Sequence, residues 1–167
     1  MSIEIKKVTT KKELHKFIRF NFELYKNNPY SVPDLYDDMM RTFTNKNAAF
    51  DFCDVIFFLA YNREGTIVGR IAGIINDKAN STTNEHKVRF GWFDFIDDIE
   101  VSRALLKAIE DWGRSKGMDT IHGPLGFTDF DAEGMLIEGF NELSTMATIY
   151  NYPYYPTHLE KLGYEKD

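Results

Sequence analysis

The chain has 167 residues with a single cysteine and no excess of positive charge. Because one cysteine cannot form a disulfide within the chain, the sequence suits a reducing compartment, and we expect a cytoplasmic protein. The 20 Lys and Arg residues are outnumbered by 26 Asp and Glu residues, which gives a net charge of −6. No basic excess remains to neutralise phosphates, so we expect no nucleic acid partner.

Long apolar runs are also missing from the sequence. The longest is Val55–Tyr61, whereas a helix that spans a bilayer needs about 20 apolar residues. The first seven residues lack the apolar segment of a secretory signal. We therefore expect no membrane partner.

Aromatic residues, in contrast, are abundant: 14 Phe, 9 Tyr and 2 Trp make up 15% of the chain. Two interpretations stand side by side, because large rings either fill the core of a small domain or line an aromatic pocket. The hydrophobic share of 43% and the charged share of 28% are typical of a folded domain. Length and composition together predict one domain over residues 1–167.

The N-terminal part predicts a strand and two helices. Residues 3–8 alternate as a strand does, and Thr10 followed by Glu13 is a capping-box pattern that opens a helix ending near residues 27–29. A second helix is expected over residues 31–41. It would carry Asp34, Asp37 and Asp38 in its first turns, where the helix dipole favours acids.

The middle of the chain predicts an antiparallel meander followed by a long helix. Its strands are expected at 55–61, 66–75 and 88–96, with a hairpin turn at 62–65 and a polar loop at 77–87. Apolar residues at 101, 104, 105, 108, 109 and 112 then form one stripe at helical period, and Gly117 supplies the stop.

The C-terminal part gives a weaker pattern. A short strand at 120–124 should run parallel to the strand at 88–96, because the helix between them is a crossover. Residues 135–140 fit a helix turn or a strand, residues 145–150 predict a strand, and 154–161 predict a last helix closed by Gly163. The predicted fold class is α/β (α+β), with a mixed central sheet, two N-terminal helices, a crossover helix and a C-terminal helix.

Several short motifs follow one another along nearly the whole chain. They are the turn Arg63-Glu64-Gly65, the segment Phe90-Gly91-Trp92-Phe93-Asp94, Glu100-Val101 with Ala104-Leu105, Gly123-Pro124, the tyrosine-rich Tyr150-Asn151-Tyr152-Pro153-Tyr154-Tyr155, and the tail Leu159-Glu160-Lys161-Leu162-Gly163-Tyr164. Each motif is weak alone, but their order resembles the GNAT superfamily of acyl-CoA N-acyltransferases. Within the superfamily, the chain resembles a group of uncharacterised bacterial GNAT-like proteins.

The resemblance implies acetyl-CoA as co-substrate, with its pyrophosphate on the turn between the fourth strand and the helix that follows. The superfamily has glycines there, whose backbone amides reach the phosphates. In this sequence acids stand in that turn, and a carboxylate about 4 Å from a phosphate charge costs on the order of 1 kcal/mol even in water. Binding by backbone amides and exclusion by acids therefore both stay open. The implied binding residues are Phe95, Ile96, Asp98, Val101, Ser102, Arg103 and Ala104, with Asp97 and Glu100 as the other acids.

The resemblance also implies catalytic roles. Asp94 is the candidate general base that takes the proton of an amine, or a solvated strand acid. The superfamily's tyrosine, which reprotonates the leaving thiolate, falls on Leu159 here, so Tyr154 or Tyr155 is the candidate acid, or part of the core. Tyr150 and Tyr152 are candidate substrate-binding residues.

No metal site is predicted. Residues 129–134 begin like a calcium loop, but the twelfth position is Phe140, which cannot coordinate the ion. The residues that bind zinc in other proteins are scattered without the spacing of a zinc site; they are His15, Cys53, His86, His122 and His158.

Two functions remain at this point. The first is transfer of an acetyl group from acetyl-CoA to an amine of a small molecule or peptide. The second is a GNAT-shaped binding or interaction domain without acyl transfer. Since GNAT domains continue past the K-L-G-Y turn, we also expect that the final strand or strands belong to a longer protein, or that another domain or chain covers the open C-terminal sheet edge.

Overall fold

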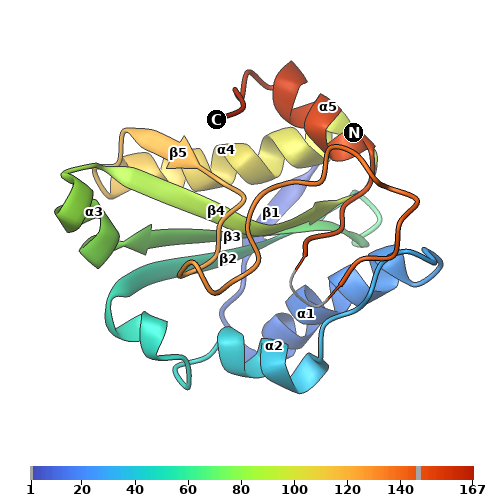
Figure 1. The fold of residues 1–167 in the computed structure, drawn as a ribbon, viewed down its shortest axis with the longest axis horizontal. Coiled ribbons are helices and arrows are strands. Elements are labelled where there is room, and N and C mark those ends of the chain that lie inside the picture. The colour runs from blue at the N-terminus through green and yellow to red at the C-terminus, as the bar shows by residue number, and fades with distance from the viewer. Residues whose placement is uncertain (1, 146–147) are drawn as a thin grey trace.

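A five-stranded sheet with the order β1-β2-β3-β4-β5 forms the centre of the computed structural model, which describes residues 2–145 and 148–167 (Figure 1). The pairs β1–β2, β2–β3 and β3–β4 are antiparallel. Strand β5 runs parallel to β4, as predicted. The strands are β1 Glu4–Lys7, β2 Cys53–Tyr61, β3 Ile67–Asn76, β4 Lys87–Phe95 and β5 Thr120–His122; the helices are α1 Lys11–Tyr25, α2 Tyr36–Thr42, α3 Asp77–Thr83, α4 Ile99–Ser115 and α5 Tyr154–Lys161, with a 3-10 turn at Ala48–Asp51.

Helices cover both faces of the sheet. Figure 1 shows α1 and α2 on one side and α4 on the other, with α5 beside the start of α4. Each side has its own apolar cluster. One joins α4 and α5 to residues such as Ile71 and Phe95, and the other joins α1 to residues such as Phe57 and Ile74. The predicted mixed α/β domain is therefore confirmed.

Local signals in the sequence set several helix ends correctly. The Thr10 side chain accepts a hydrogen bond from the Glu13 amide, and the Glu13 carboxylate accepts one from the Thr10 amide, so the predicted capping box is present. Gly117 and Gly163 take positive φ angles of 81° and 84° just after α4 and α5, a conformation that glycine adopts at little cost.

The second helix was placed too early. It begins at Tyr36, so Asp34 precedes the helix and does not lie in its first turn. Pro33 disfavours a helical conformation at Val32, and the Val32 amide instead donates to the Ser144 hydroxyl at 2.9 Å. Residues 31–35 are thus held as an extended connection.

Three other expectations differ from the structure. The predicted polar loop contains α3, which the Asn76 side chain caps at the Ala79 amide. Residues 135–140 form neither helix nor strand, because the Asn151 side chain bonds to both the amide and the carbonyl of Leu136. In the predicted strand at 145–150, residues 146–147 lie outside the described part of the chain, and residues 145 and 148–150 are not in a strand.

A bulge in β4 decides which way its side chains face. Arg70 pairs with Asp94 and Ala72 with Gly91, so two residues of β4 lie opposite one residue of β3. Trp92, at the bulge, has a φ of 43°, which is uncommon for a bulky residue. One extra residue reverses the alternation of a strand. Asp94 therefore faces α1, on the opposite side of the sheet from Phe90.

Candidate functional site

Asp94 lies in a buried ion pair with Arg70 of β3. The Arg70 Nε donates to Asp94 Oδ2 at 2.7 Å, and the two side chains are 3% and 9% exposed. Asn21 of α1 donates to the same oxygen at 3.0 Å, and Arg70 also donates to the Phe17 carbonyl. A buried charge is tolerated when it is paired with an opposite charge and hydrogen-bonded. The bonds from Arg70 and Asn21 meet both requirements for Asp94.

Two tyrosines extend this network at the end of the sheet. The Tyr155 hydroxyl of α5 donates to Asp94 Oδ1 at 3.1 Å, and the Tyr25 hydroxyl of α1 donates to Tyr155 at 2.8 Å. Burial raises the pKa of both hydroxyls, and the negative charge of Asp94 adds to the effect. Both tyrosines therefore stay protonated, and together with Asp94 they join α1, β4 and α5. The structure brings Asp94 and Tyr155 into contact, and both side-chain oxygens of Asp94 already accept hydrogen bonds.

The turn between β4 and α4 is closed by its own side chains. Asp98 is the N-cap of α4, and its carboxylate accepts from the Glu100 amide at 2.9 Å. The amides of Val101 and Ser102 donate to the Asp98 carbonyl, and the Ile96 amide donates to Val68 of β3. The amides of Ile96, Val101 and Ser102, which were expected to reach a pyrophosphate, therefore already have partners within the protein.

Helix α5 covers the same turn. His158 is 5% exposed, and its Nε2 lies 2.9 Å from Asp97 Oδ1 while its Nδ1 lies 2.9 Å from Ser102 Oγ. The Tyr154 hydroxyl donates to the Phe95 carbonyl at 2.6 Å. Partial burial raises the pKa of Tyr154, with the charges of neighbouring groups as smaller causes. Residues of α5 thus bind the turn at Phe95, Asp97 and Ser102.

In this conformation the turn does not fit a pyrophosphate. Phe95, Val101 and Ser102 are buried, and the cap position that an anion would take at the N-terminus of α4 is filled by the Asp98 carboxylate. Arg103 is exposed, but it forms an ion pair with Glu100 at 3.4 Å. Ala104 is half-buried one turn further along the helix. Of the three acids that sequence analysis noted in this turn, Asp98 is therefore the one that occupies the anion position.

Tyr150 and Tyr152 hold the C-terminal segment against α1. The Tyr152 ring stacks on Tyr25 with centroids 4.8 Å apart, and its hydroxyl donates to the Leu24 carbonyl. The Tyr150 hydroxyl donates to the Phe140 carbonyl at 2.7 Å. Both hydroxyls therefore bond to backbone atoms of this chain. Their role in substrate binding stays a prediction.

Sequence reasoning missed three polar residues around Asp94. Asn21 and Arg70 bond to it directly. The third is Asp34, whose pKa is raised by burial; the charge of Arg70 opposes this rise and the charge of Asp94 adds to it. A signal was present for Arg70, since a charge inside the apolar run of β3 requires a buried partner. No sequence pattern marks Asp34, because its relation to Arg70 and Asp94 depends on the strand bulge and on the path of residues 31–35, which are features of the tertiary structure.

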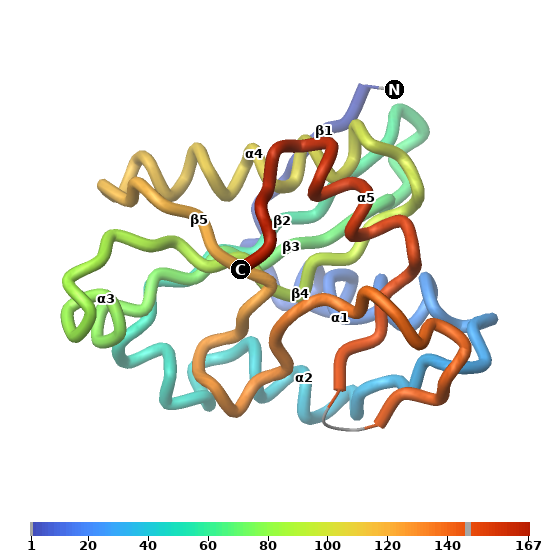
Figure 2. Tube along the Cα trace, turned by 45° about the horizontal axis from the view of Figure 1, so that its top comes forward, coloured from blue at the N-terminus to red at the C-terminus, as the bar shows by residue number. Residues whose placement is uncertain are grey.

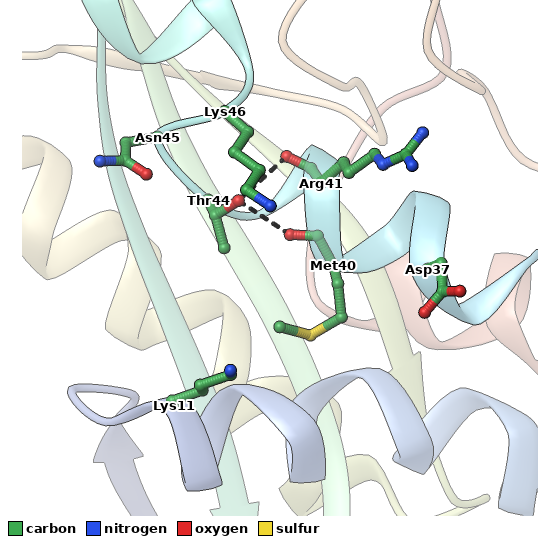
Figure 3. A pocket seen from close by; sticks show the side chains of 7 residues that line it. All are labelled: Lys11, Asp37, Met40, Arg41, Thr44, Asn45 and Lys46. Carbon is green, nitrogen blue, oxygen red and sulfur yellow. Dashed lines mark hydrogen bonds between the residues drawn. The ribbon is translucent and has the colours of Figure 1, made fainter.

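Two pockets lie elsewhere. One of about 360 Å³ is formed where α1 begins and α2 ends, with Lys11, Asp37, Arg41 and Lys46 among its lining residues (Figure 3). Another of about 220 Å³ is lined by polar residues including Arg89 and His122. None of the predicted site residues lines either pocket.

Within residues 2–145 and 148–167, no group of three or more His, Cys, Asp or Glu side chains is arranged to hold a metal ion. No helix of these residues is long and apolar enough to cross a membrane.

The fold is that of known acetyltransferases, although no known family model matches the chain. A Pyrococcus furiosus protein assigned as an acetyl transferase aligns with a TM-score of 0.58 at 14% identity, over 99% of this chain and 95% of that one. A GNAT-family acetyltransferase from Staphylococcus aureus Mu50 gives 0.51 at 18% identity, over 72% and 71%. The chain therefore has the GNAT fold.

Two curated proteins are similar in sequence. Protein YghO of Escherichia coli K12 is 33% identical over 156 residues, which is 93% of this chain and 40% of that protein. The bacterial ceramide synthase of Caulobacter vibrioides is 31% identical over 162 residues, which is 95% of this chain and 42% of the enzyme. The chain spans about two fifths of the length of the curated relatives it matches.

Proposed function

We propose that this chain is the GNAT-fold domain of a cytoplasmic N-acyltransferase that moves an acyl group from a CoA thioester to an amine. In its simplest form the donor is acetyl-CoA. The amine nitrogen attacks the thioester carbonyl, a C–N bond forms, the C–S bond breaks, and CoA leaves as the thiol once a proton reaches the sulfur. The acceptor is a small molecule or a peptide.

The observation that carries the proposal is the match to the bacterial ceramide synthase, at 31% identity over 95% of this chain. A ceramide contains an amide between a fatty acyl group and an amine, so the name denotes N-acyl transfer. The GNAT fold of the chain supports the same class of reaction, as a prior from architecture.

The proposed catalytic roles need a rearrangement around Asp94. Its carboxylate accepts bonds from Arg70, Asn21 and Tyr155, and a base must have an oxygen free to receive the proton of the amine. Release of the Tyr155 bond would free Oδ1. Tyr154, which is protonated at neutral pH, is the candidate donor to the leaving sulfur, and its hydroxyl must first leave the Phe95 carbonyl.

Binding of the pyrophosphate at the turn likewise needs the turn to open. Asp98 must release the Glu100 amide, and His158 must release Asp97. The proposed contacts are then backbone atoms of Phe95 to Ala104.

A second candidate function follows from that closed form. A GNAT-shaped domain that binds a ligand or another domain without acyl transfer needs no open notch, and the contacts of α5 with Phe95, Asp97 and Ser102 favour it. In such a domain the tyrosines of residues 150–155 would pack against the rest of the domain.

Calorimetric titration with acetyl-CoA separates the two candidates. Saturable binding, stronger than that of free CoA, supports the acyltransferase. Absence of heat at millimolar acetyl-CoA and at millimolar long-chain acyl-CoA, in both the wild type and His158→Ala, removes it and leaves the binding domain. His158→Ala is the matched variant, since loss of the α5 contact should then restore binding if the closed turn alone prevents it.

A further inference from the structure

A pocket lies where the end of α2 meets the beginning of α1. Figure 2 shows α2 and the segment after it running back alongside α1, which brings residues 40–46 to the first turn of that helix. The pocket between them has a volume of about 360 Å³, enough to hold a small molecule. It is here called the α1–α2 pocket.

The α1–α2 pocket has a basic lining. Lys11 of α1, Arg41 of α2 and Lys46 after α2 are its cations, and Asp37 is its single acid. In Figure 3 the side chains of Lys11 and Lys46 reach toward Met40 from two different segments of the chain. Since lysine and arginine are charged at neutral pH, the lining carries an excess of two positive charges.

Two of the three cations have no acidic partner. Among residues 2–145 and 148–167, no carboxylate forms an ion pair with Lys11 or Lys46. Arg41 pairs with Asp38 at 3.9 Å, but both side chains are more than half exposed, and such a pair is weak. All three cations are therefore available to a ligand.

The pocket belongs to the basic part of an acidic chain. Residues 1–46 contain nine Lys and Arg against six Asp and Glu, whereas residues 47–167 contain eleven against twenty. Every residue that lines the α1–α2 pocket comes from the first segment. Because charge of one sign around a pocket raises the local concentration of ions of the opposite sign, this pocket attracts anions although the whole chain repels them.

The charge of the lining selects the kind of anion. A phosphate monoester carries about −1.5 to −2 charges at neutral pH, which matches the excess of two positive charges, whereas a carboxylate carries only one. Arginine and lysine both bind phosphate oxygens well. Asn45 adds an amide donor to the lining, and Met40 offers an apolar wall to the organic part of an ester.

We propose that the α1–α2 pocket binds the phosphate group of a monoester through Lys11, Arg41 and Lys46. This site is separate from the Asp94 network. Asn21 and Tyr25 of that network lie ten and fourteen residues after Lys11 on the same helix, which is about 15–21 Å along its axis. The inference therefore goes beyond acyl transfer and does not depend on it.

The test titrates glycerol 3-phosphate, inorganic phosphate and glycerol into the 15N-labelled protein at constant ionic strength and follows the amide resonances. A phospholipid headgroup offers the same group, so a parallel arm measures sedimentation with vesicles of phosphatidylcholine, with and without phosphatidic acid. We expect shifts at residues 10–12 and 40–46 with both soluble phosphates and none with glycerol. Binding confined to the vesicles with phosphatidic acid would support the same site and assign the phosphate to a lipid.

Lys11→Gln and Lys12→Gln form a matched pair of variants. Both remove one exposed charge at the start of α1, but only Lys11 lines the pocket. Lys11→Gln should weaken phosphate binding about fivefold, and Lys12→Gln less than about twofold, because salt screens a charge outside the pocket.

Asp37→Asn tests the same account in the opposite direction. Loss of the one acid of the lining should tighten phosphate binding about fivefold. A damaged fold would not produce a gain in affinity, so this variant separates the charge of the pocket from the stability of the protein.

Three results would overturn the inference. The first is no binding of the soluble phosphates or of vesicles with phosphatidic acid, or shifts that fall outside the two expected segments. The second is equal affinity of Lys11→Gln and Lys12→Gln, and the third is an Asp37→Asn protein that binds no more tightly than the wild type.

Discussion

Arg70 and Asp94 face each other across β3 and β4, with the Arg70 Nε 2.7 Å from Asp94 Oδ2 and both side chains almost fully buried. The pair exists because the bulge at Trp92 turns Asp94 toward α1. Asp94 is thus a structural anchor of the sheet in addition to any catalytic role. Its substitution must therefore be examined for stability before it is interpreted as chemistry.

We predict that Asp94→Asn destabilises the protein by about 3–5 kcal/mol, because the guanidinium of Arg70 remains buried without its counter-charge. Urea unfolding followed by circular dichroism measures the change. Asp97→Asn serves as the control, since the Asp97 side chain is 66% exposed and should cost far less. Equal stabilities of the two variants would mean that the pair contributes little.

The contact of α5 with the β4–α4 turn gives a second prediction. His158→Ala removes both bonds of the imidazole, to Asp97 and Ser102, and should cost about 1–3 kcal/mol. Hydrogen exchange of the amides of residues 97–102 should become faster, because the cover of the turn is loosened. His122→Ala, at a half-buried site on β5, should leave these amides unaffected. Unchanged exchange in His158→Ala would contradict the role of α5 as a cover.

Acidic charge at the turn gives a third prediction. If acetyl-CoA places its pyrophosphate there, Glu100→Gln removes a repulsion of about 1 kcal/mol in water and should tighten binding roughly fivefold. Calorimetry measures the dissociation constant, with Glu64→Gln in the β2–β3 hairpin as the control. An affinity that stays the same would locate the pyrophosphate away from this turn.

Cys53 provides a prediction on pH. Burial raises the pKa of its thiol to about 11, from an ordinary value of about 9. The unfolded chain therefore releases this proton first, and the free energy of unfolding should fall between pH 9 and pH 11, at most about 1.4 kcal/mol per pH unit for this group. Cys53→Ala should show a shallower fall in urea unfolding under reducing conditions. Parallel curves for the two proteins would show that the thiol is not the cause.

The sequence predicted elements whose signals are local. The capping box at Thr10 and Glu13, the apolar stripe of α4 and the range of α5 are confirmed, because each depends on residues within a few positions of one another. The start of α2 was wrong because a hydroxyl 112 residues away, on Ser144, holds the Val32 amide.

The candidate site likewise contains residues that the sequence indicated and residues that only the tertiary structure brings in. Sequence reasoning selected Asp94 and Tyr155, which do meet, but it did not supply Arg70, Asn21 or Asp34. Their approach depends on a one-residue bulge, and such a bulge leaves little trace in a pattern of apolar residues. The acids of the β4–α4 turn were noted from the sequence. That His158 bonds to Asp97 and covers this turn could not be predicted, because it depends on how α5 packs.

The most direct test of N-acyl transfer is the mass of the product. Purified protein is incubated with acetyl-CoA carrying 13C in its acetyl group and with octylamine, and thiol release is measured in the same samples; palmitoyl-CoA replaces acetyl-CoA in a parallel series. N-acyl transfer predicts the amide of octylamine with the labelled acetyl group, one thiol for each amide formed, and neither product without protein. Thiol and amide no greater than in the protein-free samples, with both donors, would contradict it.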